Sequence, residues 1–222
     1  MILVFKYLAI AVVAYLLGAI PFGLIISKRM ANVDIRQHGS GNIGATNVFR
    51  TLGTKLGILT ALLDLGKAAL AVWLSMLIIG DDAFIVAGHD IHVQSAQCLA
   101  AIMVMVGHNW SAYIGFKGGK GVACFIGGLL VINWMVALVG LAAGIVVALV
   151  TRYVSLGSML ASLCVLLAMV VLALLAVVAP LYALYGLVAA GLIIYQHRTN
   201  ITRLQAGTEL KLGDKGMKSD RL

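Results

Sequence analysis

The chain has 222 residues, of which 62% are hydrophobic and only 11% are charged. A soluble domain of this size could not hide so much apolar surface, so the composition indicates an all-α, polytopic integral membrane protein. The net charge of +8 does not indicate nucleic-acid binding, because the basic residues lie in short loops and in the tail. Cys98, Cys124 and Cys164 are far apart, which predicts packing roles and neither a disulfide framework nor a metal site.

The first apolar segment, Phe5 to Ile26, predicts a membrane helix. No basic region precedes it, which argues against a cleaved signal peptide. It leads to a first glycine-rich segment, GSGNIGATNVFRTLG at 39–53, which we expect to be a cytoplasmic loop because basic residues surround it. Small residues and backbone N–H groups beside a fixed cation are suited to binding an anion. The candidate binding residues of this segment are Gly39, Ser40, Gly41, Asn42, Thr46, Asn47 and Arg50.

The next apolar segment, Leu56 to Gly80, carries two charges, Asp64 and Lys67. Their i, i+3 spacing places them on one helix face, and charges inside a membrane are usually paired or functional. We expect a pair that braces the first segment from below, with a direct catalytic part as the alternative. Residues 81–97 contain no Lys or Arg, which predicts an extracytoplasmic loop. A third helix near 98–106, with some residues upstream, returns to the cytoplasm.

The second glycine-rich segment is GHNWSAYIGFKGGKG at 107–121. Its small residues would let the backbone approach an oxyanion that a lysine neutralises. It does not match the nucleotide-binding loop GxxxxGK[ST], because no Ser or Thr follows Lys120. No Asp cluster accompanies it to hold magnesium, so we expect phosphate to bind without metal or nucleotide hydrolysis. The candidates are Lys117, Gly118, Gly119, Lys120 and Gly121.

For the histidines outside the third segment, structural roles are favoured over catalytic ones. His108, at the start of the second segment, is interpreted as a structural residue at a helix end. His38 is interpreted as a solvated loop residue, and His89 and His92 fall in the predicted outer loop.

Residues 122–195 are mostly apolar, with interruptions at Asn133, Arg152 and Pro180. Asn133 suits an outer turn between two short helices, Arg152 belongs on the inner side, and two more helices flank Pro180. Because the basic tail should be cytoplasmic, an even number of crossings must join the second segment to it.

This parity predicts about seven membrane helices in a single domain (1–222), with the N-terminus outside and the C-terminus cytoplasmic. Residues 210–222 form the predicted cytoplasmic tail. Gly140 and Gly144 make a GxxxG pair, which favours close helix packing rather than a functional role.

The third segment, HRTNITRLQAGTE at 197–209, is polar and basic. His197 and Asn200 share a helix face at i, i+3 spacing, and a histidine can move a proton near neutral pH. The alternative is an interfacial histidine that only ends a helix. Glu209 could accept hydrogen bonds and hold the tail in place, or it could be a solvated charge. Arg198 is a further candidate for substrate binding.

The three segments together, in their order, spacing and membrane context, resemble the signature motifs of the bacterial acyl-phosphate–glycerol-3-phosphate acyltransferases (PlsY). Similarity extends to DLGK at 64–67 and to TRYVSLGS at 151–158. The chain departs from the family pattern at Ser111, where a proline is frequent, and at Cys124, where a hydroxyl residue is frequent. These departures affect the expected path of the second segment rather than the reaction.

The resemblance implies transfer of a fatty acyl group from acyl phosphate to the sn-1 hydroxyl of glycerol 3-phosphate, giving lysophosphatidic acid and phosphate. It implies a site at the cytoplasmic face of the bacterial inner membrane, with no cofactor, no nucleic acid and no obligate protein partner. The motif positions place Ser40, Thr46, Asn47 and Arg50 at a phosphate site and Gly118 to Gly121 at a glycerol 3-phosphate site. His197 and Asn200 belong to the third motif, in which Glu209 is more structural than chemical.

An acyl phosphate is already activated, so the chemistry requires positioning and charge stabilisation rather than a covalent nucleophile. We expect the first segment to hold the acyl phosphate and Lys120 to hold glycerol 3-phosphate. The hydroxyl proton would go to His197 or to a substrate phosphate oxygen. The catalytic candidates are Ser40, Arg50, Lys120, His197 and Asn200.

Three alternatives stay open. Ser40 could be an acylated nucleophile, although no Gly-x-Ser-x-Gly elbow accompanies it. An organic-phosphate transporter would fit the basic loops, but the polar residues are all expected on one side, whereas a transporter site must be reached from both. A structural membrane subunit leaves the three phosphate-suited segments unexplained.

Overall fold

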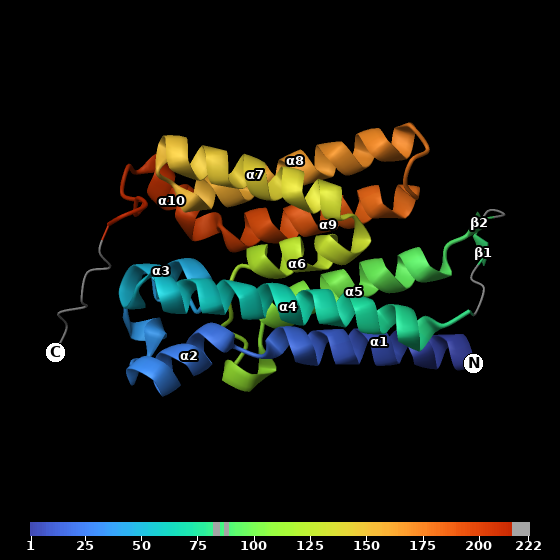
Figure 1. Ribbon diagram of the computed structural model, residues 1–222, viewed down its shortest axis with the longest axis horizontal. Helices are drawn as coiled ribbons and strands as arrows, with labels where there is room; N and C mark the ends of the chain where they lie inside the picture. The colour runs from blue at the N-terminus through green and yellow to red at the C-terminus, as the bar shows by residue number, and fades with distance from the viewer. Residues whose placement is uncertain (82–84, 87–88, 215–222) are drawn as a thin grey trace.

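A computed structural model describes residues 1–81, 85–86 and 89–214, and Figure 1 shows a bundle of nearly aligned helices. The first apolar segment forms α1 (Ile2–Ala19) and α2 (Phe22–Ala31), which are separated at Pro21. Proline has no N–H and forces the residue before it into an extended conformation, which ends the helix. Ile20 accordingly has a ψ of 114°.

The other elements follow in chain order. They are η1 (Ile35–Gln37), α3 (Ala45–Leu52), α4 (Thr54–Ile79), β1 (Ile85–Val86), β2 (His89–Asp90), α5 (His92–Asn109), η2 (Ala112–Ile114), α6 (Val122–Ile132), α7 (Trp134–Thr151), α8 (Val154–Leu174), α9 (Pro180–Gln196) and α10 (Arg198–Gln205). The strands β1 and β2 pair antiparallel as a short ribbon. Asn133 ends α6 and caps α7 by accepting a hydrogen bond from the N–H of Val136, so the predicted turn at this position is confirmed.

The short helix α6 lies in the middle of the bundle (Figure 1). It packs against α4 and α5 on one side and against α7 on the other, while α8 packs against both α7 and α9. The main core joins these layers through fully buried side chains such as Val72, Met105, Phe125 and Val165. The first segment packs on a second, smaller cluster, formed by Leu24, Ile35, Ile43 and Val48.

Small residues bring several helices into close contact. A side-chain carbon at Gly18 of α1 would lie 2.2 Å from the carbonyl oxygen of Val104 in α5, and one at Gly107 would lie 2.1 Å from that of Tyr15. Gly140 and Gly144 of α7 pack against α8, where a carbon at Gly140 would lie 2.4 Å from Val165. The prediction that the GxxxG pair mediates helix packing is thus confirmed.

Among the described residues, four helical segments are long and apolar enough to cross a membrane: 2–31, 54–79, 134–151 and 154–174. The 11-residue helix α6 is only about 16 Å long, about half of a bilayer's hydrocarbon thickness. The start of α1 and the helix α10 lie at opposite ends of the bundle (Figure 1), as an odd number of crossings requires. Seven crossings and the orientation of the termini stay predictions.

Two predictions of the loop and helix bounds need correction. The first segment is a loop only up to Gly44, because the eight residues between Gly44 and Gly53 form α3. The third helix begins at His92, so residues 92–97, which were assigned to the outer loop, belong to α5, where Gln97 accepts a hydrogen bond from Tyr182 at 2.5 Å. Most of the third segment is the helix α10, in agreement with the helical stretch expected around Asn200.

Candidate active site

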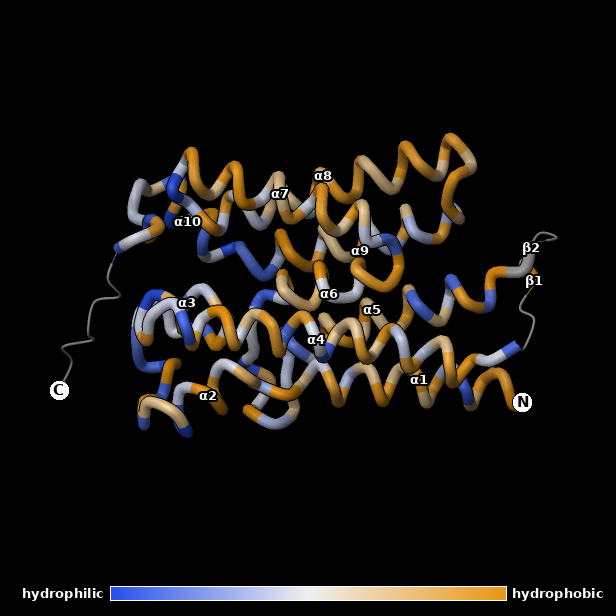
Figure 2. Tube along the Cα trace, in the orientation of Figure 1, coloured by the Kyte–Doolittle hydropathy of each residue, from blue (hydrophilic) through white to orange (hydrophobic). Residues whose placement is uncertain are grey.

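The three segments converge on two adjoining cavities near the polar end of the bundle, where Figure 2 shows hydrophilic residues around α2, α3 and α10. The first cavity, of about 340 Å³, combines polar side chains with an apolar wall. Its polar lining includes Ser40, Asn42, Thr46, Asn47, Arg50, Lys120, Ser155, His197, Asn200, Arg203 and Glu209. Its apolar wall includes Leu65, Val122, Ile126 and Leu141.

The second cavity, of about 280 Å³, is more polar and is lined mainly by the second and third segments. It contains the cations Lys117, Lys120, Arg198 and Arg203. Ser40, Asn42, Lys120 and Arg203 line both cavities. These four residues mark the boundary at which molecules in the two cavities could meet.

The loop of the first segment is built around the side chain of Asn47. Its Oδ1 accepts a hydrogen bond from the backbone N–H of Ser40 at 2.9 Å, and its Nδ2 lies 2.8 Å from the carbonyl oxygen of Asn42. Nδ2 also contacts the carbonyl oxygens of Ile35 and His38. The amide is 2% exposed, so its hydrogen-bonding capacity is used by the loop. We had expected Asn47 to bind substrate, and these contacts instead assign its polar atoms to shaping the loop.

Gly39 and Gly41 contribute backbone shape rather than cavity lining. Both have positive φ angles, 59° and 71°, which favour glycine. A side-chain carbon at Gly39 would lie 2.2 Å from Oδ1 of Asn47, so the loop has no room for one. The helix α3 then begins at Ala45 and directs Thr46 and Arg50 to the first cavity.

The second segment folds back on the end of α5. The N–H groups of Gly118 and Gly119 donate to the carbonyl oxygens of Asn109 and His108, at 3.1 and 2.9 Å. A side-chain carbon at Gly118 would lie 2.0 Å from the carbonyl oxygen of His108. This close return places Lys120 between the two cavities, and Gly121 (φ 79°) then starts α6.

Lys120 donates a hydrogen bond of 2.6 Å to Oδ1 of Asn200. Burial lowers the pKa of Lys120 from 10.5 to about 8, an effect that Arg203 and Arg50 reinforce and Glu209 opposes. Asn200 in turn donates from Nδ2 to Glu209 at 2.6 Å. The amide of Asn200, listed among the catalytic candidates from sequence, is therefore a link between a cation and a carboxylate.

His197 ends α9 and is 2% exposed. Its Nδ1 lies 2.8 Å from the carbonyl oxygen of Ile193, which can only accept, so Nδ1 carries the proton in the neutral ring. Burial, reinforced by the positive charge of Lys120, lowers the pKa of His197 to about 4. The neutral ring thus has an unprotonated Nε2 at neutral pH, as a proton acceptor requires.

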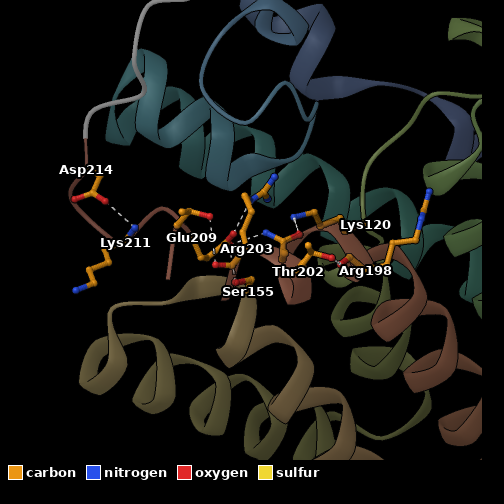
Figure 3. Close-up of polar contacts among 10 residues, drawn as sticks. Lys120, Ser155, Arg198, Thr202, Arg203, Glu209, Lys211 and Asp214 are labelled. Carbon is orange, nitrogen blue, oxygen red and sulfur yellow. Dashed lines mark hydrogen bonds and ion pairs between the residues drawn. The ribbon is translucent and has the colours of Figure 1, made fainter. Parts of the chain in front are cut away.

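Glu209 connects the third segment to α8, as Figure 3 shows. Its carboxylate accepts hydrogen bonds from Arg203 (2.8 Å), Ser155 (2.7 Å) and Asn200 (2.6 Å). Burial alone would raise the pKa of Glu209, but these hydrogen bonds outweigh it and lower the pKa. The predicted hydrogen bonding of Glu209 is therefore present.

Arg198 and Lys117 lie at the rim of the second cavity. The guanidinium of Arg198 stacks on the ring of Tyr195, with Cζ 4.6 Å from the ring centre, and donates to the carbonyl oxygen of Tyr195. Both cations are exposed. They could attract an anion to the cavity without being buried beside it.

Asp64 and Lys67 of α4 form the predicted ion pair, with Lys67 Nζ 2.8 Å from Asp64 Oδ1. Lys67 also lies 2.8 Å from the carbonyl oxygen of Ile20 and 3.0 Å from Nδ1 of His108. His108 lies in the last turn of α5, as its interpretation as a helix-end residue predicted, but it is buried and lines the first cavity.

Asp64, His108 and Cys124 are close enough to hold a metal ion, with ligand atoms within 4.8 Å of one another. The ammonium of Lys67 already contacts two of these three side chains. The chain therefore supplies its own cation to this cluster.

The two departures from the family pattern have structural partners. The hydroxyl of Ser111 donates to the carbonyl oxygen of Ala19 at 2.5 Å, which ties the second segment to the end of α1. The thiol of Cys124 lies 3.6 Å from the carbonyl oxygen of Asp64.

Sequence reasoning gave no role to Ser155 or Ser158 and only a structural role to His108, yet all three line the first cavity. The two serines belong to the segment TRYVSLGS at 151–158 and lie in the first turns of α8, which is otherwise mostly apolar. A role for His108 at the site could have been inferred from its position in the second glycine-rich segment, 107–121.

Comparisons with known proteins agree on one family. The family model described as glycerol-3-phosphate acyltransferase matches residues 8–207. A glycerol-3-phosphate acyltransferase of Clostridioides difficile is 44% identical over 96% of this chain and 98% of its own length. One from Rhizobium etli is 41% identical over 94% of this chain and 93% of its own.

Two crystal structures of PlsY (YgiH), an integral membrane glycerol 3-phosphate acyltransferase, share the fold. The glycerol 3-phosphate form has a TM-score of 0.79 and 35% identity over 93% of this chain and 96% of that chain. The lysophosphatidic acid form has a TM-score of 0.78 and 34% identity over 93% of this chain and 95% of that chain. With a family model over most of its length and relatives above 40% identity, this chain belongs to the glycerol-3-phosphate acyltransferase family.

Proposed function

We propose that this protein transfers a fatty acyl group from acyl phosphate to the sn-1 hydroxyl of glycerol 3-phosphate. The products are lysophosphatidic acid and inorganic phosphate. The observation that carries the proposal is the pair of cavities that share Ser40, Asn42, Lys120 and Arg203. One has an apolar wall beside a phosphate-suited loop, which fits an acyl phosphate, and the other is small, polar and cationic, which fits glycerol 3-phosphate.

The first segment would hold the phosphate of the donor. Arg50 and Thr46 line the first cavity beside the N-terminus of α3, where N–H groups and the helix dipole favour an anion. The acyl chain would lie along Leu65, Ile126 and Leu141. Charge that builds on the departing phosphate would be stabilised by Arg50 and by Lys120 at the boundary.

Glycerol 3-phosphate would bind in the second cavity, between the second segment and α10. Lys120 reaches both cavities, so one ammonium could hold the acceptor phosphate and orient the hydroxyl toward the donor. In the reaction the hydroxyl oxygen forms the new ester bond to the acyl carbon, and the bond from that carbon to the phosphate oxygen breaks.

The hydroxyl proton would pass to Nε2 of His197 or to an oxygen of a substrate phosphate. The Nδ1 hydrogen bond of His197, which leaves Nε2 unprotonated, supports the first route. The second needs no protein base. In the described part of the chain, no hydrogen bond joins the Ser40 hydroxyl to a histidine or carboxylate, which disfavours an acyl-enzyme route.

We infer a site on the cytoplasmic side of a bacterial inner membrane. The cations that flank it are on α2, α3, α10 and the turn before α8, all at the same end of the bundle (Figure 1). The solved relatives, described as glycerol 3-phosphate and lysophosphatidic acid forms, support an acceptor and a product of this chemistry.

The test is phosphate release by the purified protein in detergent, with palmitoyl phosphate, with and without glycerol 3-phosphate, in the presence of a chelator. Release only with glycerol 3-phosphate, together with lysophosphatidic acid, supports the proposal. Palmitoyl-coenzyme A and palmitoyl-acyl carrier protein are the competing donors. Turnover with either but not with palmitoyl phosphate would overturn the choice of donor, and no turnover with any donor would favour a transporter and call for a flux assay in liposomes.

A matched pair of variants ties the activity to the site. Lys120→Met removes the shared ammonium, whereas Lys55→Met removes an exposed ammonium at the start of α4. We expect loss of turnover in the first variant and retention in the second. Equal activity in both would contradict the role given to the two cavities.

A further inference from the structure

Two histidines line the first cavity, and the reaction proposed above uses only His197. We propose that His108 also contacts substrate, as a hydrogen-bond donor through Nε2–H to an oxygen that carries or develops negative charge. We further propose that Lys67 is a positioning residue that fixes the proton on Nε2. This inference rests on the proposed acyl transfer and adds a substrate contact to the same site.

The position of the proton follows from the contacts of Lys67. Its ammonium has three N–H donors and lies within 3.0 Å of three acceptor atoms: Asp64 Oδ1, the carbonyl oxygen of Ile20 and Nδ1 of His108. An ammonium cannot accept a hydrogen bond, so Nδ1 of His108 must accept from it. A neutral imidazole with an accepting Nδ1 carries its proton on Nε2, and a doubly protonated ring carries one there as well.

Lys67 itself is held from two directions. Asp64, one helical turn earlier in α4, supplies the balancing charge, and both side chains are 2% exposed. The carbonyl oxygen of Ile20 is available because Pro21 ends α1 at this point. A fixed ammonium with fixed partners keeps the imidazole of His108 in one orientation.

The Nε2 edge of His108 faces the second segment. A side-chain carbon at Gly119 would lie 2.0 Å from Nε2, so a glycine is required for this edge to approach the loop that carries Lys120. His108 is 4% exposed and lines the cavity that we assign to the acyl phosphate. A donor that is desolvated and preorganised in this way stabilises developing negative charge far better than water does.

The two histidines that line the first cavity therefore differ in the hydrogen-bonding role of Nε2. Nε2 of His197 is an acceptor, because its Nδ1 donates to Ile193, and Nε2 of His108 is a donor, because its Nδ1 accepts from Lys67. Acyl transfer needs both functions: an acceptor for the hydroxyl proton and a donor for the carbonyl or phosphate oxygen. A merely structural His108 would pair with Asp64 and Lys67 without contacting substrate, so its replacement would leave the kinetics of acyl transfer unchanged.

The kinetic test compares His108→Leu with His108→Gln, which retains a side-chain N–H donor. We expect His108→Leu to lower kcat by about 10²-fold, in the range known for one oxyanion donor, and His108→Gln to recover at least part of this loss. A loss in kcat places the bond on the transition-state oxyanion, whereas a raised KM for palmitoyl phosphate with unchanged kcat places it on the donor phosphate. Values of kcat and KM for His108→Leu within about threefold of wild type would overturn the proposal.

The role of Lys67 is tested with the charge-neutral double variant Asp64→Asn with Lys67→Met. This double variant should lower kcat in the wild-type background. It should cause little further loss in the His108→Leu background, because Lys67 is proposed to act through the imidazole of His108, which that background lacks. Full additivity would contradict the positioning role. Ser75→Ala is the matched control, since Ser75 is a buried polar residue of the same helix whose hydroxyl donates to the carbonyl oxygen of Val72.

A measurement on the wild-type protein does not depend on the folding of any variant. Nitrogen NMR of ¹⁵N-histidine-labelled protein in micelles distinguishes protonated from unprotonated ring nitrogens. We expect a protonated Nε2 at His108 and an unprotonated Nε2 at His197, and an unprotonated Nε2 at His108 would overturn the proposal. Absence of wild-type turnover would instead contradict the proposed function, and the NMR result does not depend on turnover.

Discussion

Lys120 and Asn200 are 80 positions apart in the sequence, yet the ammonium of one donates a 2.6 Å hydrogen bond to the side-chain oxygen of the other. Asn200 in turn donates a hydrogen bond to Glu209, whose carboxylate also accepts hydrogen bonds from Arg203 and Ser155. The cation at the boundary of the two cavities is therefore oriented by the third segment. This arrangement explains why a lysine in the second segment and a polar helix near the C-terminus serve one site.

The lowered pKa of Lys120 predicts an unusual alkaline limit for the enzyme. With a pKa of about 8, the ammonium is lost as the pH rises through that value, and phosphate binding weakens with it. We expect kcat/KM for glycerol 3-phosphate to fall about tenfold for each pH unit above about 8. The measurement is a pH profile between 6 and 10 at subsaturating acceptor, corrected for spontaneous hydrolysis of the donor.

Lys120→Arg provides the control, because a guanidinium keeps its charge over this range. The arginine variant should be less active at neutral pH, since its planar group cannot reproduce the contact with Asn200. Its profile should nevertheless lack the limb near pH 8. The same limb in both proteins would assign it to another group and contradict the prediction.

His197 governs the opposite end of the profile. Because its pKa is lowered to about 4, the neutral ring persists as the pH falls and is protonated only near that value. We expect activity to be level between pH 5 and 7 and to decline near pH 4. His197→Ala should lower kcat by about 10²- to 10⁴-fold if the ring takes the hydroxyl proton.

His38→Ala is the matched variant, because His38 lies outside both cavities. The variant loses the contact of the His38 ring with the carbonyl oxygen of Asp34 but keeps the backbone carbonyl that Asn47 contacts. It should retain wild-type kcat. Near-wild-type turnover by His197→Ala would exclude this residue as the base and leave a substrate phosphate oxygen in that role.

The sequence was sufficient to predict which three segments form the candidate site, but not the contacts within and between them. Charge placement and residue type identified 39–53, 107–121 and 197–209, and the structure shows all three at shared cavities. The ion pair of Asp64 and Lys67 followed from helix periodicity alone. Local patterns of this kind are visible in a sequence because the partners are close along the chain.

Contacts between distant positions could not be predicted in the same way. His108 meets Lys67 across 41 positions, and Glu209 meets Ser155 across 54. Residues before Cys98 were assigned to the outer loop because polar residues such as Gln97 are frequent in loops. In the structure Gln97 lies in α5 and accepts a hydrogen bond from Tyr182, a residue 85 positions away. In each case tertiary packing, rather than local propensity, determines the role of a polar side chain.

The hydrogen bonds of Glu209 predict a pH-dependent contribution to stability. Its pKa is lowered in the folded protein, so the stabilisation is present above the unfolded pKa near 4.5 and is lost as the pH falls through the folded value. Glu209→Gln should cost about 1–3 kcal/mol at pH 7, because a charged acceptor of three hydrogen bonds is removed. The thermal midpoints of wild type and variant in detergent should converge as the pH is lowered below 4. A difference that stays constant across this range would show that the carboxylate charge is not responsible.

Asn47 offers the sharpest distinction between a residue that shapes the site and one that binds substrate. Its amide accepts from Ser40 and donates to the carbonyl oxygens of Asn42, His38 and Ile35, so Asn47→Asp keeps the acceptor but loses every donor. Unsatisfied buried carbonyl groups and a buried negative charge should lower stability by about 1–3 kcal/mol or more.

Thr46→Ala is the neighbour for comparison, because Thr46 also lines the first cavity but no described contact of its hydroxyl holds the loop. We expect Thr46→Ala to retain the wild-type melting temperature and to raise KM for palmitoyl phosphate. Asn47→Asp should instead lower the melting temperature and turnover together, since the loop that presents Ser40, Asn42 and Thr46 would lose its shape. A variant at Asn47 with wild-type stability and only a raised KM would return this residue to the role of a direct substrate ligand.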